Sequence, residues 1–212
     1  MQYIPDEETV EANKQEFINL VKKIEREGAN ITHLLDKLEK SDFYYAPASA
    51  RYHGAYRGGL VDHCLNVYYN LVSLCKAKRL EFDESTLIIV ALFHDISKMN
   101  YYEIYNQNKK VYSPDGSKRD DGGNYDWQVV KSYKAKESFD RFIFGSHGQN
   151  SEFMIRQFIP LTLEESVAII HHMGMYDNPQ SVDLSVINNK YTLAVMLHVA
   201  DMISTFVDER II

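Results

Sequence analysis

The feature that most constrains the fold is the run LIIVALF, residues 87–93, which is apolar without interruption and ends at His94-Asp95. Asp83 offers a helix N-cap shortly before the run, so we expect a helix from about 83 to 93. A helix that is apolar on all faces is stable only where other elements surround it. The sequence therefore predicts a central helix, with His94 and Asp95 buried at its C-terminal end.

Amphipathic patterns on both sides of this run predict further helices that would pack around it. Apolar residues recur at helical spacing, and glycines or capping residues mark several of the ends. The expected ranges are 7–27, 32–40, 60–78, 148–158, 162–172 and 190–208, with an extended, Asn-rich segment before the last. Thr162 and Glu165 form a capping-box pattern at the start of one of them. The pattern indicates an all-α fold in one domain that spans residues 1–212.

Residues 101–140 interrupt the helical pattern. The segments YYEIYNQNKKVYS and YDWQVVKSYKA are rich in aromatic and β-branched residues, and they flank the polar stretch SPDGSKRDDGGN. This composition is typical of two strands joined by a turn, so we expect a small β-hairpin within about 101–135. The insertion lies between His94-Asp95 and His147, and we therefore expect it to form one wall of a pocket beside them.

Length and charge restrict the classes of function. With 212 residues the chain is long enough for one domain with a sizeable core. The net charge of −7 argues against binding to extended nucleic acid or to an anionic membrane surface. No apolar run has membrane-spanning length, and Cys64 and Cys75 lie too far apart on one predicted helix for a disulfide. We expect a cytoplasmic protein with reduced thiols and no membrane partner.

Histidine and aspartate residues recur in apolar, helical contexts along the chain. The set is His63, His94, Asp95, His147, one of His171 and His172, and Asp201. Imidazole and carboxylate ligands together suit Fe, Mn, Co, Ni or Zn, whereas cages of oxygen alone suggest Ca or Mg. We interpret the set as a metal centre in a helical core, which points to an enzyme. A lone helical histidine is more often structural, and we interpret His33 and His198 in that way.

The order H…HD…H…H…D, carried by GGLVDH, ALFHDISK, GSHG, HHMG and HVAD, resembles the HD-domain metal-dependent phosphohydrolases. The resemblance implies a helical core over residues 53–205, on which the helices of residues 1–50 pack, and one or two divalent ions (Mn, Fe, Co, Ni, Zn or Mg). It assigns His63, His94, Asp95 and Asp201 as signature ligands, and His147 and His172 as ligands of a second ion bridged by Asp95. His172 is preferred to His171 because the family pattern places this ligand two residues before a glycine, here Gly174.

This sequence departs from the family pattern at one position, and its insertion resembles that of one group of family members. Ser97 stands where the family often has glycine, so the turn after the HD doublet is expected to differ. The insertion is similar to that of small stand-alone HD hydrolases of bacteria and their phages. Lys98 matches a basic position near a substrate phosphate, and it is predicted to act in catalysis with Asp95.

Further substrate contacts are expected from the aromatic loop and from the insertion. Arg57, Tyr56 and His53 are the predicted substrate-binding residues, because guanidinium groups bind phosphate and aromatic rings stack on bases. Lys110 is a further candidate for phosphate contact. Tyr102 and Trp127 are expected either to stack on a base or to pack the insertion onto the core.

Three classes of function are compatible with these ligands. The leading hypothesis is that a metal-activated hydroxide cleaves a phosphate ester of a nucleotide or related small molecule, so the expected partner is a small phosphorylated substrate. The stretch RYHGAYRGGLVDH is similar to the HD domain of certain bacterial 3′-to-5′ exoribonucleases, which gives an alternative. The second class is a di-iron oxygenase, because a few members of the superfamily use the same ligand set to activate O₂. A metal-binding module without catalysis is the third class.

Overall fold

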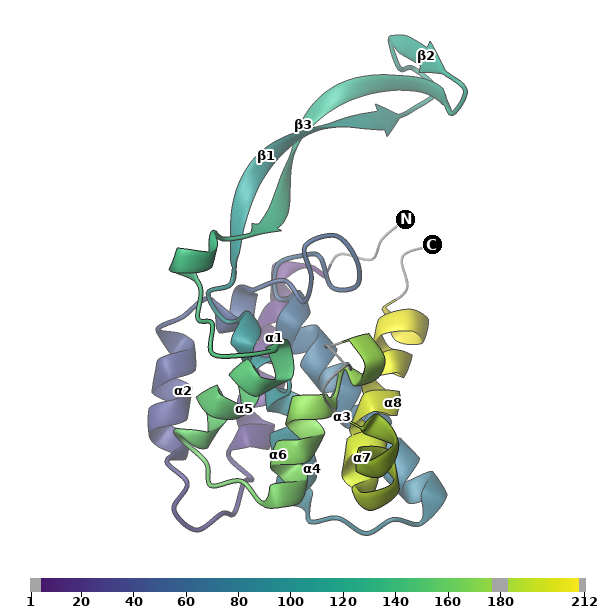
Figure 1. The fold of residues 1–212 in the computed structure, drawn as a ribbon. Coiled ribbons are helices and arrows are strands. Elements are labelled where there is room, and N and C mark those ends of the chain that lie inside the picture. The colour runs from purple at the N-terminus through teal and green to yellow at the C-terminus, as the bar shows by residue number, and fades with distance from the viewer. Residues whose placement is uncertain (1–4, 177–182, 210–212) are drawn as a thin grey trace.

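The computed structural model describes residues 5–176 and 183–209, which form a bundle of helices with a projecting β-hairpin (Figure 1). The helices are α1 (Glu7–Val21), α2 (Ile31–Glu39), α3 (Gly59–Lys78), α4 (Glu84–Phe93), α5 (His147–Arg156), α6 (Leu163–His171), α7 (Leu184–Lys190) and α8 (Thr192–Ile203). Short 3-10 turns lie at Phe43–Tyr45, Ile96–Lys98, Ser138–Asp140 and Gly174–Tyr176, and a π-helical turn lies at Ser204–Asp208. The expected all-α fold is confirmed. No helix in the described ranges is long and apolar enough to cross a membrane.

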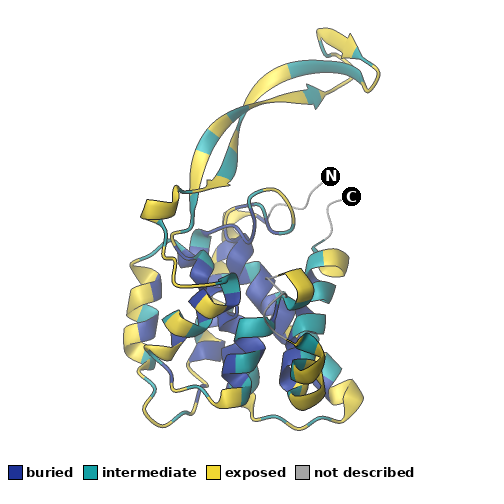
Figure 2. Ribbon diagram, viewed as in Figure 1, coloured by how far each residue is buried: buried dark blue, intermediate teal, exposed yellow. Residues whose placement is uncertain are grey.

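Helix α4 lies at the centre of the bundle, as its apolar sequence predicts. Every residue from Ile88 to Phe93 is buried, and α1, α3 and α6 pack against the helix. Figure 2 shows the buried residues on the inward sides of the surrounding helices. Phe17 of α1 is fully buried, and its ring lies 5.7 Å from that of Phe93 at 89°. The N-terminal helix therefore contributes directly to the core around α4.

A buried ion pair ties the segment after α1 to α6. Glu165 Oε1 lies 2.7 Å from Arg26 Nη2, and the same carboxylate accepts a hydrogen bond from Thr86 Oγ1 at 2.7 Å. The backbone N–H of Glu25 donates to Ser85 Oγ at 2.9 Å. These tertiary contacts draw the chain out of the helix, which explains why α1 ends at Val21 and not at 27 as predicted.

Capping residues fix several other helix boundaries, some of which differ from the prediction. The Thr162–Glu165 capping box is present, as expected. A second capping box, formed by Ser146 and Gln149, starts α5 at His147. The segment predicted to be extended contains α7, because Asp183 caps it by accepting hydrogen bonds from two backbone N–H groups. Residues 177–182 of that segment lie outside the described residues.

The insertion is a β-hairpin that spans the predicted range. Strands β1 (Tyr102–Tyr112) and β3 (Gly123–Ala135) pair antiparallel from Tyr102↔Ala135 to Tyr112↔Tyr125, and β2 (Lys118–Asp120) adds to β3. The backbone N–H of Lys136 donates to Tyr101 O at 3.0 Å and closes the root of the hairpin. Beyond that root the two strands extend away from the helices (Figure 1).

The packing of α1 gives a stability prediction. Phe17→Ala removes a fully buried ring and should lower the free energy of unfolding by about 3–5 kcal/mol, the usual cost of truncating a core aromatic residue. Ile143→Ala is the control, because Ile143 is exposed and its loss should change stability by less than about 0.5 kcal/mol. Urea unfolding followed by circular dichroism measures both. Equal midpoints for the two variants would show that α1 does not stabilise the core.

Candidate metal centre

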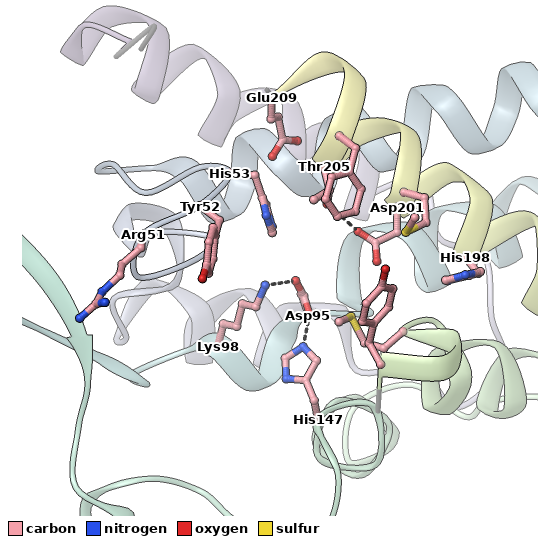
Figure 3. Close-up of a pocket in the computed structure, with 14 residues that line it drawn as sticks. Arg51, Tyr52, His53, Asp95, Lys98, His147, His198, Asp201, Thr205 and Glu209 are labelled. Carbon is pink, nitrogen blue, oxygen red and sulfur yellow. Dashed lines mark hydrogen bonds and ion pairs between the residues drawn. The ribbon is translucent and has the colours of Figure 1, made fainter. Parts of the chain in front are cut away.

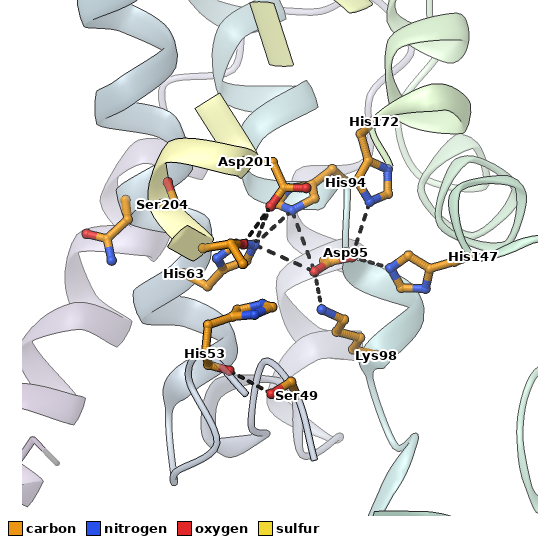
Figure 4. A network of polar contacts seen from close by, with 12 residues as sticks. Ser49, His53, His63, His94, Asp95, Lys98, His147, His172, Asp201 and Ser204 are labelled. Carbon is orange, nitrogen blue, oxygen red and sulfur yellow. Dashed lines mark hydrogen bonds and ion pairs between the residues drawn. The ribbon is translucent and has the colours of Figure 1, made fainter. Parts of the chain in front are cut away.

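The predicted ligand side chains converge where several helices begin or end (Figure 4). They are His63 near the start of α3, His94 and Asp95 at the end of α4, His147 at the start of α5, His172 at the end of α6, and Asp201 in α8. Adjacent residues within a helix point in different directions. Because α4 ends at this point, both members of the His94-Asp95 doublet can face the centre.

Helix ends also fix the orientation of two of these histidines. Nδ1 of His94 lies 2.8 Å from Ala91 O, and Nδ1 of His172 lies 2.7 Å from Ile169 O. Both carbonyls belong to the last turn of a helix, where carbonyls lack N–H partners within the helix. Since a carbonyl only accepts, Nδ1 carries the hydrogen in both rings. Nε2 therefore keeps its lone pair and faces the centre.

Side chains from other elements hold the remaining two histidines. Nδ1 of His63 lies 3.0 Å from Glu209 Oε1. Nδ1 of His147 lies 3.1 Å from Ser97 Oγ, and Ser151 Oγ lies 2.9 Å from the same hydroxyl. The serine that departs from the family pattern at position 97 thus contributes a contact that supports His147. In all four histidines the Nε2 atom is left to face the centre.

Asp95 lies between two pairs of histidines. Its Oδ2 atom is 3.6 Å from His94 Nε2 and 3.8 Å from His63 Nε2. Its Oδ1 atom is 3.5 Å from His172 Nε2 and is in contact with His147 Nε2. The two oxygens of this buried carboxylate therefore face two different pairs of histidine nitrogens.

The donor atoms have the spacing of a coordination shell. Nε2 of His63 lies 3.3 Å from His94 Nε2 and 3.3 Å from Asp201 Oδ1. Ligand atoms around a tetrahedral ion lie about 3.3 Å apart when the metal–ligand bonds are about 2.0 Å long. Within the described structure, Nε2 of His172 is buried and has no hydrogen-bond partner, so it is available as a ligand. The residues present fit a metal ion, in two overlapping groups: His63, His94 and Asp201, and His94, Asp95 and His172.

The charges around the centre favour a cation. Burial lowers the pKa of His63, but the carboxylates of Glu209 and Asp201 outweigh burial and raise that pKa to about 10. Burial raises the pKa of Asp201, but its contact with His63 outweighs this and holds the pKa well below its usual range. Excess negative charge thus retains a proton on His63. A divalent ion satisfies the same carboxylates and releases that proton.

Lys98 adds a positive charge at the edge of the centre. Its Nζ atom lies 2.5 Å from Asp95 Oδ2. Burial lowers the pKa of Lys98, but Asp95 outweighs burial and raises the pKa above its ordinary value. The ammonium group therefore stays charged beside the carboxylate that the two histidine pairs share.

A cavity of about 830 Å³ opens onto the centre (Figure 3). Asp95, Asp201 and Lys98 line it on the side of the centre. The apolar and aromatic residues of the lining are Tyr52, Met173, Tyr176, Met202 and Phe206. The cavity is large enough for a nucleotide-sized molecule, and its lining offers both charged groups and aromatic rings.

Of the three predicted substrate-binding residues, the structure places one in the lining of the cavity. His53 lines the cavity, and its ring lies 4.9 Å from the ring of His63. Tyr56 is buried, and its hydroxyl hydrogen-bonds to the carboxylate of Asp62 rather than facing the cavity. Arg57 stacks on Tyr45 at 3.9 Å and pairs with a glutamate of α1, also outside the cavity lining. The loop turns Tyr56 towards α3 and Arg57 towards α1, so the cavity lining includes neither of them.

Arg51 lines the cavity where Arg57 was expected. Both arginines belong to the same aromatic loop, and only the path of that loop decides between them. The prediction that the insertion walls the cavity is also wrong, because among the described residues the lining includes none from 99 to 146. Trp127 is exposed on the hairpin, and Lys110 pairs with Asp120 at 2.5 Å.

The remaining histidines are distinguished by position. His172, not His171, directs Nε2 towards Asp95, as the family pattern implied. His198 has the structural role predicted for it, since its Nδ1 lies 2.6 Å from the carbonyl oxygen of His172. It also lines the cavity.

Glu209 is the residue that the sequence did not point to. It follows Asp201 by eight positions, which α-helical winding alone would place about 80° around the helix axis from Asp201. The π-helical turn at Ser204–Asp208 winds more widely and brings Glu209 back to His63. Asn66 Nδ2 donates to Glu209 at 3.0 Å and holds the carboxylate in place.

A model of the HD domain matches residues 60–205 of the chain. The chain belongs to the HD-domain family. Comparisons with curated proteins and with solved structures found no match. HD-domain proteins are generally metal-dependent hydrolases that bind divalent ions, and the buried histidine and aspartate groups described above suit that chemistry.

The support that Glu209 gives to His63 leads to a prediction about metal affinity. Glu209→Gln removes the negative charge and leaves the shape, so the affinity for Mn²⁺ or Co²⁺ should fall about 10- to 100-fold. Competition with a fluorescent chelator, without substrate, measures this. Asp208→Asn is the control, because Asp208 contacts Asn70 and not a histidine. Wild-type affinity in Glu209→Gln would exclude the role of Glu209 in orienting His63.

Proposed function

We propose that this protein hydrolyses phosphate esters of nucleotides or related small molecules with divalent ions bound at the centre. The observation that carries the proposal is the Asp95 carboxylate, shared between two pairs of histidines and adjoined by Lys98. Divalent ions at the centre, together with Lys98 and Arg51 of the cavity lining, would supply positive charge that favours an anionic group there.

The ligand assignment follows the direction in which each donor atom points. His63, His94, Asp95 and Asp201 would hold one ion, and His147, His172 and Asp95 would hold a second. The imidazole-rich set favours Mn, Fe, Co, Ni or Zn over Mg. Divalent ions in such a site supply Lewis acidity, which activates water and neutralises charge on the phosphoryl oxygens.

The side chains around the centre leave water as the nucleophile. Cys64 is fully buried, and burial raises the pKa of its thiol well above the usual range. Ser97 and Ser151 are buried and hydrogen-bonded to each other. Among the described residues, the cavity lining contains neither serine nor cysteine, and the hydroxyl of its one threonine, Thr205, donates to Asp201 Oδ1 at 3.3 Å. We therefore expect no covalent phosphoenzyme.

Two cationic side chains and one neutral histidine prepare the cavity for a phosphate ester. Lys98 offers a point charge beside Asp95, and Arg51 offers a guanidinium group that can bind phosphate through two donors. Burial, together with the charges of His63 and Lys98, lowers the pKa of His53 to about 4. His53 is therefore neutral at pH 7 and can donate one hydrogen bond and accept another.

The proposal predicts different losses of activity for two neighbouring residues. Asp95→Ala should abolish turnover, because it removes the carboxylate that faces all four histidines. Lys98→Ala should lower kcat by about 10- to 1000-fold, as expected for one electrostatic contact to the phosphoryl group. Lys23→Ala, at an exposed ion pair, is the control. The measurement is phosphate release from a panel of nucleotides with Mn²⁺, Co²⁺, Ni²⁺, Fe²⁺ and Mg²⁺, together with metal analysis of the purified protein.

Two results of this assay would contradict the proposal. Full activity in Asp95→Ala, or a trapped phosphoenzyme, would rule out the mechanism. Processive degradation of a single-stranded RNA oligomer, with mononucleotides untouched, would favour the exoribonuclease alternative. Iron-dependent consumption of O₂ without phosphate release would favour the oxygenase.

Two tyrosines of the cavity lining predict selectivity for a substrate that contains a base. Tyr52 and Tyr176 line the cavity, and both rings are largely exposed to it and to solvent. Stacking on a base contributes about 1–3 kcal/mol, so replacing both tyrosines by alanine should lower kcat/KM for a nucleotide about 5- to 150-fold. The kcat/KM for glycerol phosphate, which has no base, should change little. An equal loss of kcat/KM for both substrates would exclude base stacking on these two tyrosines.

A further inference from the structure

The hairpin of residues 101–136, called the arm below, has little to stabilise it within one chain. Beyond its root, β1 and β3 pair only with each other and with the short β2, and the ribbon stands clear of the helices (Figure 1). An isolated two-stranded ribbon is marginally stable in water. Figure 2 shows that its side chains are exposed or half-buried along its whole length. The arm therefore has a surface that a further contact can stabilise.

The register of the strands divides the arm into two unlike faces. One face, called the aromatic face, carries Tyr102, Ile104, Tyr112, Tyr125, Trp127, Val129 and Tyr133. The opposite face carries polar cross-strand contacts, such as Glu103 with Lys134 at 2.9 Å and Gln107 with Ser132 at 3.1 Å. Antiparallel sheets with one polar and one apolar face normally bury the apolar one.

The aromatic face is nevertheless open in the single chain. Trp127 and Tyr112 are each 50% exposed, and Val129 and Ile104 are 68% and 60% exposed. Tryptophan and tyrosine are the residues that most often anchor protein interfaces. The composition and the exposure together indicate a binding face.

The charge of the arm indicates which partner fits. Residues 101–136 contain seven of the 23 basic residues and five of the 30 acidic residues, a net charge of +2. The other residues contain sixteen basic and twenty-five acidic ones, a net charge of −9. The arm thus has the opposite sign to the rest of its own chain. A second copy of the chain offers an acidic body to a basic arm.

The same charges disfavour a polyanion on the aromatic face. Lys110, which lies on this face beside Trp127, is paired with Asp120 at 2.5 Å and rests 4.4 Å from the Tyr125 ring. The register also places Lys118 and Lys131 on this face. Non-specific binding of nucleic acid depends on many cations that neutralise phosphates, and a face with three lysines, one of them paired with Asp120, offers few.

We propose that the arm is a self-association element, and that its aromatic face is buried against a second copy of this chain. In a dimer with two-fold symmetry each arm would lie against the body of the other copy, so each dimer would bury two aromatic faces. The cavity lining includes no arm residue, so association through the arm is separate from the chemistry of the metal centre.

Analytical ultracentrifugation over the micromolar range tests the proposal. The wild type should sediment with about twice the 24.6 kDa mass of one chain. Replacing Trp127 and Val129 with aspartate should raise the dimer dissociation constant about 30-fold or more, the effect expected when an aromatic anchor is lost. Gln128→Asp with Val130→Asp is the matched control, because these residues alternate with the first pair on the same strand and face the other way. Circular dichroism should show an unchanged helical core in both variants.

Three results would overturn the proposal. The first is a wild type that stays monomeric over the whole concentration range. The second is an equal dissociation constant for the two double variants. The third is a monomer that binds a fluorescent single-stranded oligonucleotide and loses that binding in the Trp127 and Val129 variant, which would assign the aromatic face to nucleic acid.

Discussion

The carboxylate of Asp95 is the group on which the rest of the centre depends. It lies at the end of the most apolar helix in the bundle, where an unpaired charge would be costly. Four histidines and Lys98 surround it, and each of its oxygens faces a different pair of imidazoles. The packing that makes α4 central therefore also places a negative charge where several other helices meet. A cation at that point resolves the cost of burying the charge.

The orientation of the ligands comes from ordinary features of helix ends. His94 and His172 each turn back to a carbonyl in the last turn of their own helix, so each Nδ1–H satisfies a carbonyl that lacks a partner within the helix. His63 lies in the second turn of α3 and His147 is the first residue of α5, so neither lies at the C-terminal end of its helix, where free carbonyls occur. Glu209 and Ser97 supply the missing acceptors. One site thus uses backbone support for two ligands and side-chain support for the other two.

The sequence predicted the bundle and the ligand set because both rest on local patterns. The apolar run before His94-Asp95 specifies a central helix, and the histidines and aspartates stand in apolar, helical contexts. Arg57 and Arg51 could not be distinguished, because both lie in a loop whose path depends on contacts such as Arg57 with Tyr45. Glu209 was missed because the π-helical turn that returns it to His63 has no simple sequence signal. The direction of the hairpin, away from the cavity, was missed for a similar reason, since strand composition indicates pairing but not direction.

The closed root of the hairpin separates the hairpin from the candidate metal centre, although the hairpin lies between two residues of that centre in the sequence. Asp95 and His147 lie on either side of the insertion, yet the Lys136–Tyr101 backbone hydrogen bond brings its two ends together before the ligands are reached. The positions of Asp95 and His147 relative to each other therefore do not depend on the number of residue pairs beyond the root. The hairpin is a geometrically independent module. Its length and surface can change while the side chains of the candidate metal centre keep their places.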